Sequence, residues 1–218
     1  MVTCCIFDLD GVIVDTAKYH YLAWRQLAEK LGFEFTPEQG EATKGVSRMA
    51  SLDIVLKAGC MENRFSQEEK LKMATEKNEI YLSYIQKMTS EEVLPGVENF
   101  LKELHEKGIK VVLGSASKNA GVILDRCNLR RWFDVLVDGT LVSKAKPDPE
   151  VFSKGAELSG ISPRECVVFE DAAAGVEAAT RAGMRSVGVG GSPLLSHATM
   201  QLTSFEGFSF DDLIKGVE

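Results

Sequence analysis

The chain has 218 residues, of which 44% are hydrophobic and 26% are charged, so it is large and apolar enough to bury a substantial core. Its formal net charge of -7 excludes a general attraction to nucleic acid or to an anionic membrane. The sequence has no apolar run of the roughly 18 residues that a membrane span needs, and no secretory signal pattern. We therefore expect a cytoplasmic monomer without nucleic-acid or membrane partners.

The first predicted strand covers residues 2–8, an apolar run that ends at an aspartate. The interval 15–92 has no comparable run, and its apolar residues have the spacing of helices, which we place at 16–31, 48–58 and 67–87. In the first of these helices, His20, Trp24 and Leu27 share one face. This pattern predicts a helical cap domain, residues 15–92, inserted after the first strand.

The rest of the chain alternates between short strands and helices. The predicted strands are rich in β-branched residues and span 109–114, 133–137, 166–169 and 186–189. The predicted helices span 97–107, 120–127, 149–158 and 172–182. Because short continuous apolar runs are typical of strands buried on both faces, we predict an α/β core with a doubly wound (Rossmann-like) parallel sheet, formed by residues 1–14 and 93–218.

Polar side chains follow the predicted strands at their carboxyl ends. In an open parallel sheet these ends lie along one edge, and ligands bind there. The residues at the strand ends are Asp8 and Asp10 after the first strand, Ser115 after the second, Lys146 after the third, and Glu170 and Asp171 after the fourth. We expect them to converge on one site.

Carboxylates gathered this closely repel one another, and protonation of one is favoured unless a cation lies between them. Mg²⁺ resolves the repulsion most naturally, since it prefers oxygen ligands and also binds phosphate oxygens. Such a site suits phosphoryl transfer, in which one aspartate attacks phosphorus and the other moves a proton. Lys146 and Ser115 would then hold the phosphate oxygens on which negative charge is stabilised.

These residues also have purely structural alternatives. The aspartates Asp8 and Asp10 can end a strand and cap a helix. Glu170 and Asp171 can be first-turn acids of the following helix, where the helix dipole favours negative charge. Ser115 can be an ordinary turn residue.

Four segments together resemble the motifs of the haloacid dehalogenase-like phosphotransferases. They are FDLDGV, GSAS, KAKPDPEVF and VVFEDAAAG, they occur in the family's order, and the resemblance covers the core from residue 2 to about 189. The resemblance implies that Asp8 is the nucleophile, which forms an aspartyl-phosphate, and that Asp10 is the general acid/base. It also implies one Mg²⁺ per chain, bound by Asp8, the backbone carbonyl of Asp10 and Asp171, with Glu170 close by.

The chain is most similar to the sugar-phosphate mutases of that family, over nearly its whole length. The segments that carry this similarity are DTAKYHYLAWRQLAEKLG, TKGVSRMASL and EKNEIYLSYI in the cap and GSASKN in the core. It implies a Mg²⁺-dependent mutase that interconverts β-glucose 1-phosphate and glucose 6-phosphate through glucose 1,6-bisphosphate. The alternative is a Mg²⁺-dependent phosphatase of a small sugar or polyol phosphate on the same fold.

The same similarity implies roles for residues of the cap and of the GSASKN loop. A mutase has to hold the second, non-transferring phosphate of a bisphosphate, and a guanidinium matches phosphate oxygens well. Thr16 and His20 would set Asp10 as acid/base. The implied substrate-binding residues are Arg48, Ser117 and Asn119 for the second phosphate, Ala116 and Lys118 in the same loop, and Lys44, Gly45, Val46, Ser47, Trp24 and Lys77 on the sugar side of the cleft.

Some of these residues have a structural alternative as well. His20 and Trp24 can be packed in the cap, Arg48 can be a solvated charge at a helix start, and Lys77 lies in a charge-rich helix whose default is a solvated face. The sequence also departs from the mutase pattern after Asp171, where alanines stand in place of a serine and a glutamine. The missing hydroxyl can alter the surroundings of the metal.

Overall fold

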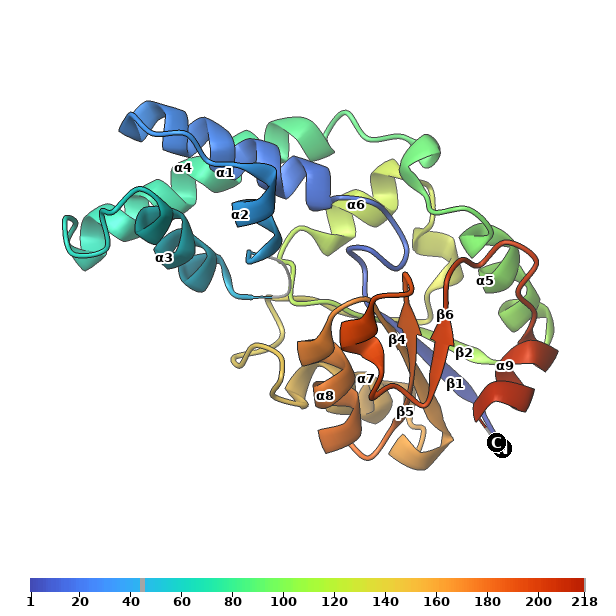
Figure 1. The fold of residues 1–218 in the computed structure, drawn as a ribbon. Helices are drawn as coiled ribbons and strands as arrows, with labels where there is room; N and C mark the ends of the chain where they lie inside the picture. Colours follow the sequence, from blue (N-terminus) through green and yellow to red (C-terminus); the bar gives the residue numbers. More distant parts are fainter. Residues whose placement is uncertain (44–45, 218) are drawn as a thin grey trace. The chain divides into compact units, whose positions relative to one another are not determined.

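The computed structural model describes residues 1–43 and 46–217, which belong to two compact units (Figure 1). An α/β unit combines Met1–Asp15 with Met88–Glu218, and a helical unit comprises Thr16–Lys87. The predicted cap range of 15–92 extends beyond the helical unit at its C-terminal side. The reason is that the segment after residue 87 pairs with the loop after the first strand: Val14 forms a bridge with Val93, and the Leu94 N–H donates to the Ile13 carbonyl at 3.0 Å.

The α/β unit contains a parallel sheet, and the predicted doubly wound fold is confirmed. Within the described residues the sheet has six strands in the order β3-β2-β1-β4-β5-β6. Their bounds are β1 Cys4–Phe7, β2 Lys110–Gly114, β3 Val135–Val137, β4 Cys166–Glu170, β5 Arg185–Val189 and β6 Met200–Leu202. Strands β1 and β4 lie at the centre, so both of their faces are covered and they are wholly apolar up to their carboxyl ends.

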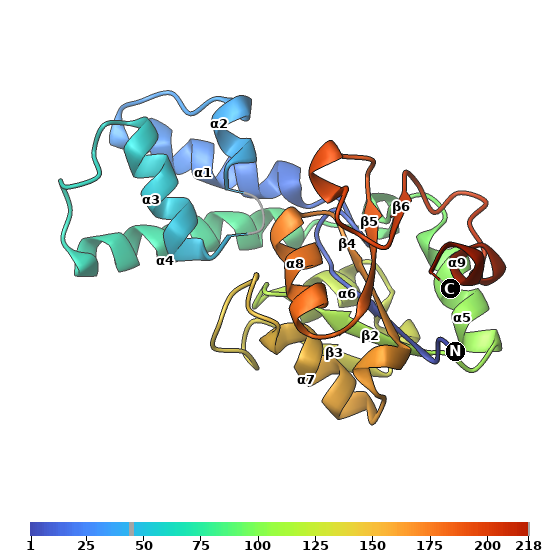
Figure 2. The same cartoon turned by 60° about the horizontal axis from the view of Figure 1, so that its bottom comes forward.

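Helices cover both faces of the sheet, with α7 and α8 on one face and α5 and α9 on the other (Figure 2). The helices of this unit are α5 Val97–Glu106, α6 Ala120–Arg126, α7 Glu150–Ser159, α8 Ala173–Arg181 and α9 Phe210–Val217. Alternate strand residues point to opposite faces. Ile6 therefore packs with Phe152 of α7 on one face, and Phe7 stacks on Phe169 on the other, with 4.6 Å between ring centroids.

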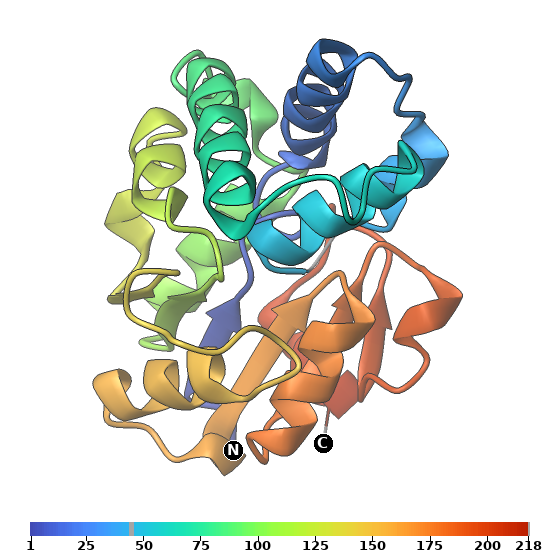
Figure 3. The same cartoon turned by 90° about the vertical axis from the view of Figure 1, so that its left-hand side faces the viewer.

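The helical unit contains α1 Ala17–Leu31, α2 Pro37–Glu41, α3 Arg48–Ala58 and α4 Gln67–Ile85. Helices α1 and α4 lie side by side, and α3 packs against both (Figure 3). Their ends follow from local chemistry: Ser66 and Glu69 form a capping box at the start of α4, and Gly32 ends α1 with a φ of 90°. The core of this unit is formed by one cluster, which includes Trp24, Leu27 and Leu52.

No described helix is long and apolar enough to cross a membrane. Helices α2 and α9 and strand β6 were not predicted from the sequence. Each is short, five, eight and three residues respectively, so a periodic apolar pattern has little length in which to show.

We predict that replacing Phe100 with Ala lowers the free energy of unfolding of the α/β unit by about 3–5 kcal/mol. Phe100 of α5 is 1% exposed, and its ring lies 5.6 Å from Phe169 and 5.1 Å from Phe208. Urea denaturation followed by fluorescence measures the loss. The control is Leu194→Ala, because Leu194 is 73% exposed and its truncation should change stability by no more than about 0.5 kcal/mol. A loss below about 1 kcal/mol for Phe100→Ala would contradict this prediction.

Candidate active site

The carboxyl ends of the two central strands bring three carboxylates together. Phe7 of β1 pairs in register with Phe169 of β4, so Asp8 and Glu170 follow at the same level of the sheet. Ligand oxygens of Asp8, Glu170 and Asp171 all lie within 4.8 Å of one another. Three of the predicted carboxylates therefore form a real cluster.

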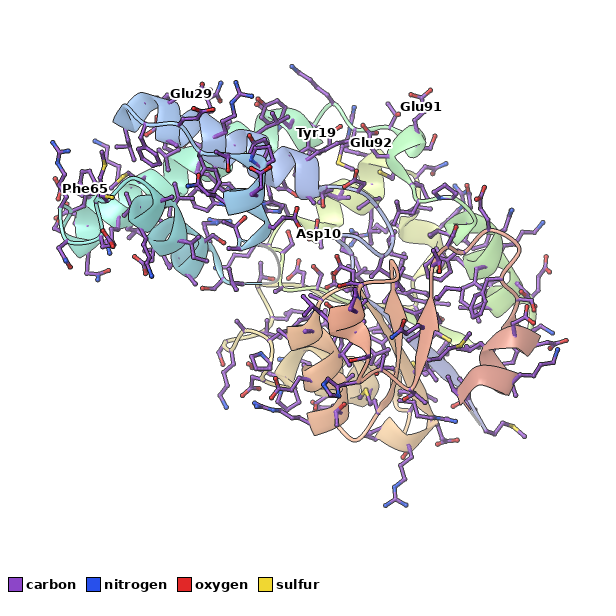
Figure 4. All side chains as sticks on the ribbon, in the orientation of Figure 1. Asp10, Tyr19, Glu29, Phe65, Glu91 and Glu92 are labelled. Carbon is purple, nitrogen blue, oxygen red and sulfur yellow. The ribbon has the colours of Figure 1, made fainter. Side chains whose placement is uncertain are left out.

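Asp10 lies on the loop that follows β1 (Figure 4). Its backbone N–H donates to Oδ2 of Asp8 at 3.1 Å. Asp10 and Val14 form an isolated bridge that closes the loop. The loop thus fixes one oxygen of Asp8, and the Asp10 side chain does not belong to the cluster of three carboxylates.

Two glycines make room for the carboxylates. Gly11 has a φ of +77°, and a Cβ there would lie 2.1 Å from Oδ2 of Asp171. A Cβ at Gly175 would lie 2.0 Å from the carboxyl carbon of Glu170. Since real Cβ contacts are never this short, any larger residue at either position would displace a carboxylate.

Lys146 pairs with this cluster as a cation. Its Nζ lies 2.5 Å from Oδ1 of Asp8 and 2.8 Å from Oε2 of Glu170, and its side chain is 5% exposed. Burial alone would lower the pKa of the lysine, but the charges of Asp8 and Glu170 outweigh it and raise the pKa above its ordinary value. Lys146 is therefore charged at any physiological pH.

The buried carboxylates of the cluster affect one another's protonation. Burial, together with the charges of Asp8 and Asp171, raises the pKa of Glu170 to about 8 in spite of its ion pair with Lys146. The raised pKa of Glu170 shows that a proton, or a cation in its place, is favoured at this cluster. Its donors are all carboxylate oxygens, the ligands that Mg²⁺ prefers, so the residues present fit a magnesium ion.

Ser115 directly follows β2, the strand next to β1 in the sheet, and is 1% exposed. Its backbone N–H donates to the Val137 carbonyl at 2.9 Å, and its Oγ accepts from the Ser117 N–H at 3.1 Å. A second bond of the same kind joins the Asn119 N–H to Oγ of Ser117 at 3.3 Å. The hydroxyls therefore shape the loop from Ser115 to Asn119, as expected of turn residues, while Ala116 and Lys118 are exposed.

In the helical unit, His20, Lys77, Trp24 and Tyr81 form one cluster. Nζ of Lys77 lies 2.9 Å from Nδ1 of His20, and it also lies 4.5 Å from the Trp24 ring centroid and 5.0 Å from that of Tyr81. The imidazole stacks on Tyr81 with 4.0 Å between centroids. Because an ammonium only donates hydrogen bonds, Nδ1 of His20 accepts and Nε2 carries the proton.

Burial and the nearby charges of Lys77 and Arg48 hold the pKa of His20 well below its ordinary value. His20 is therefore neutral at physiological pH. Lys77 is only 3% exposed, so the alternative of a solvated lysine is wrong. Trp24 is 1% exposed and lies in the core of the helical unit. This is the packing role given above as the alternative to substrate binding. Thr16 is fully buried.

Arg48 begins α3 and is held by a residue that the sequence analysis missed. Its Nη2 donates to Oδ1 of Asn78 at 2.7 Å. The preceding Ser47 caps the helix, with its Oγ accepting from the Ala50 N–H at 3.3 Å, and Val46 is 42% exposed. Lys44 and Gly45, also predicted to bind substrate, lie outside the described residues.

Asn78 and Tyr81 were both missed, although a signal was present. They stand one and four residues after Lys77, and the helical spacing of three or four places Tyr81 on the lysine's side of α4. What the sequence does not show is that α1 lies against this side and brings His20 to it.

The departure after Asp171 has a local consequence. Ala172 is the residue before α8 and provides no side-chain cap, and its backbone N–H donates to Oε1 of Glu170 at 3.3 Å. A serine there would offer a hydroxyl to the exposed N–H groups of the helix. In this chain the Glu170 carboxylate accepts the hydrogen bond from the Ala172 N–H, and position 172 has no hydroxyl.

Comparison with known proteins identifies the class of enzyme. A family model of haloacid dehalogenase-like hydrolases matches residues 2–183. The chain therefore belongs to the haloacid dehalogenase-like hydrolase family and is an enzyme of that type.

Individual relatives narrow the comparison. The chain is 44% identical to the β-phosphoglucomutase of Bacillus subtilis strain 168, over 87% of this chain and 84% of the relative. A β-phosphoglucomutase crystal structure from Clostridium difficile has a TM-score of 0.94 and 42% identity, covering 100% of this chain and 97% of that one. A phosphorylated carbohydrates phosphatase from Thermotoga maritima is 34% identical, over 84% of this chain and 82% of the relative. Both mutases and phosphatases thus resemble this chain.

We predict that magnesium stabilises the protein more at high pH than at low pH. Without divalent cations, the native state keeps a proton on Glu170 between pH 4.5 and about 8, whereas the unfolded chain has released it. The free energy of unfolding should therefore fall as pH rises through this window. Mg²⁺ replaces the proton, so its effect on Tm should be larger at the upper end of the window.

The measurement is thermal unfolding with EDTA and with Mg²⁺ at both ends of that pH window. Asp171→Asn removes one carboxylate of the cluster and serves as the control, in which the Mg²⁺-dependent rise in Tm should disappear. An equal rise at both ends in the native chain would show that no proton on Glu170 competes with the metal.

Proposed function

We propose that the protein is a Mg²⁺-dependent mutase that interconverts β-glucose 1-phosphate and glucose 6-phosphate through an aspartyl-phosphate and glucose 1,6-bisphosphate. The observation that carries the proposal is the 44% identity with a β-phosphoglucomutase over 87% of the chain. The cluster of Asp8, Lys146, Glu170 and Asp171 supports the phosphoryl-transfer part of it, because it combines a nucleophile with a cation that binds phosphate.

In the proposed reaction Asp8 is the nucleophile. One of its oxygens bonds to the phosphorus of the bisphosphate while the bond from phosphorus to the sugar oxygen breaks, and Asp10 gives that oxygen a proton. In the second half, a sugar hydroxyl of β-glucose 1-phosphate attacks the phosphorus of the aspartyl-phosphate, the bond from phosphorus to the Asp8 oxygen breaks, and Asp10 takes the hydroxyl proton. A bound Mg²⁺ at Asp8, the Asp10 carbonyl and Asp171, with Glu170 close by, would supply positive charge that offsets repulsion between carboxylates and phosphate.

Lys146 and Ser115 have the task of stabilising charge on the transferring phosphate. The contacts of Lys146 support this role, since its ammonium is already desolvated and lies 2.5 Å from the nucleophilic carboxylate. A phosphate that approaches Asp8 therefore meets a charge in place, without the delay of reorienting a flexible side chain.

The second phosphate of the substrate is assigned to Arg48, with Ser117 and Asn119 as further donors. Burial lowers the pKa of Arg48 from its ordinary value, but an arginine remains charged nonetheless. Asn78 holds one end of the guanidinium fork and restricts its rotation. Thr16, His20 and Lys77 are assigned to Asp10 and to the sugar, in keeping with the neutral imidazole and the charged lysine beside it.

The second candidate is a phosphatase that releases phosphate from a small sugar phosphate. It is favoured by the 34% identity with a phosphorylated carbohydrates phosphatase. The two candidates differ in whether water or a sugar hydroxyl accepts the phosphoryl group, so product analysis distinguishes them.

We predict that the protein, given β-glucose 1-phosphate, Mg²⁺ and a trace of glucose 1,6-bisphosphate, forms glucose 6-phosphate well in excess of free phosphate. The two products are measured together, by coupled dehydrogenase and by molybdate assay. Phosphate release without glucose 6-phosphate would refute the mutase and support the phosphatase. Asp8→Asn serves as the negative control, because it should abolish both activities, and turnover in that variant would refute the covalent mechanism.

We also predict that Arg48→Ala lowers kcat/KM for the mutase reaction by about 10–100-fold, the value of a charge-assisted hydrogen bond. Hydrolysis of p-nitrophenyl phosphate, which has no second phosphate, should change less than about threefold, since no interaction with Arg48 is lost. The matched control is Lys57→Ala, which removes an exposed cation from the same helix. Equal losses on both substrates would refute a second-phosphate role for Arg48.

A further inference from the structure

Lys146 lies on a segment that has no helix or strand of its own. Residues 142–149 connect the region after β3 to the start of α7, and Lys146 stands near the middle of them. The ammonium of Lys146 nonetheless occupies a defined position between Asp8 and Glu170. Residues outside the segment therefore have to fix its backbone through contacts.

The carboxylate of Glu150, the first residue of α7, makes the bonds that do so. Its Oε2 accepts from the Lys144 N–H at 2.7 Å, from the Ser143 N–H at 3.0 Å and from the Ser143 hydroxyl at 3.1 Å. Its Oε1 accepts from the same hydroxyl at 3.2 Å. These bonds also lower the pKa of Glu150, with the Lys144 N–H contributing most. One carboxylate thus satisfies two consecutive backbone donors just ahead of Lys146.

The same helix holds Lys146 from the other side. Phe152, two residues after Glu150, is fully buried against the sheet, and its ring centroid lies 4.8 Å from Nζ of Lys146. Downstream, Oδ1 of Asp148 accepts from the Glu150 N–H at 3.0 Å and so ties the end of the segment to the first turn of α7. The helix is therefore a fixed support, and Glu150 is its link to the backbone that precedes the lysine.

We propose that Glu150 is a positioning residue for Lys146: by holding the Ser143–Lys144 backbone to the first turn of α7, it keeps the ammonium at Asp8. Within the described part of the chain, the hydrogen bonds of Glu150 go to Ser143, Lys144 and Asp148, so it acts through the segment that it holds. The inference goes beyond the mutase proposal, because it applies equally to a mutase and to a phosphatase.

The test measures how fast Asp8 is phosphorylated by acetyl phosphate in Mg²⁺, followed by intact-protein mass spectrometry. This donor carries no sugar, so the result does not depend on the identity of the substrate. Glu150→Ala should slow phosphorylation by about 10–100-fold, the range expected from misplacing a catalytic group by about an ångström. Glu150→Gln should stay within about threefold of the native rate, because its amide oxygen can still accept from both backbone N–H groups.

Two controls separate positioning from a general structural role. Glu157→Ala removes an exposed glutamate from the same helix and should leave the rate unchanged. In a Lys146→Ala background, Glu150→Ala should have no further effect, because a residue that acts through Lys146 has nothing left to position.

Three outcomes would overturn the proposal. They are a native rate in Glu150→Ala, an equal slowing by Glu150→Ala with and without Lys146, and a Glu150→Gln variant as slow as Glu150→Ala. Glu150→Leu, which keeps the bulk of the side chain and accepts no bond, replaces Glu150→Ala if that variant does not fold. If neither folds, hydrogen exchange in the native chain decides, since unprotected Ser143 and Lys144 amides would contradict the bonds to Glu150.

Discussion

The buried contact of one ammonium with two carboxylates is the constraint on which the rest of the α/β unit depends. Lys146 pairs with Asp8 and Glu170, and the carboxylate of Asp171 lies in the same cluster. Removing charges from water is costly, so a buried cluster of charges persists only when the rest of the fold offsets this desolvation free energy. The parallel pairing of the two central strands, the glycine contacts and the hold of α7 on the lysine segment all serve to keep this cluster together.

The repulsion among these carboxylates links the stability of the protein to the chemistry proposed for the site. Repulsion between clustered carboxylates lowers the free energy of unfolding, and a bound divalent cation or a proton reduces that repulsion. The residues that weaken the protein without a bound cation are therefore those proposed to bind the metal and attack the substrate. The helical unit shows the opposite arrangement, in which the charge of Lys77 is shielded by the faces of Trp24 and Tyr81 and by a neutral His20.

The sequence predicted the strand ends well because a parallel strand buried on both faces is a short apolar run, and a polar residue marks where it stops. Asp8, Glu170 and Asp171 were identified in this way, whereas Lys146 lies well beyond the end of β3. It did not predict the burial of Lys77, which depends on aromatic rings from two helices, or the roles of Asn78 and Glu150. In the sequence those side chains have the pattern of ordinary helix-surface residues, because their partners lie on other segments of the chain. The sequence also did not show that Val14 pairs with Val93, because this is a long-range contact.

The contact between Gly11 and Asp171 has a consequence for how such sites change over time. Gly11 belongs to the loop that follows Asp8, and Asp171 belongs to a segment more than half the chain away. The space that a side chain at position 11 would need is nonetheless occupied by the Asp171 carboxylate. Position 11 cannot be exchanged alone, because a side chain there would push the Asp171 carboxylate aside. A chimera that joins the N-terminal segment of this chain to the rest of a relative would therefore need a glycine at this position wherever the acid of the other segment is kept.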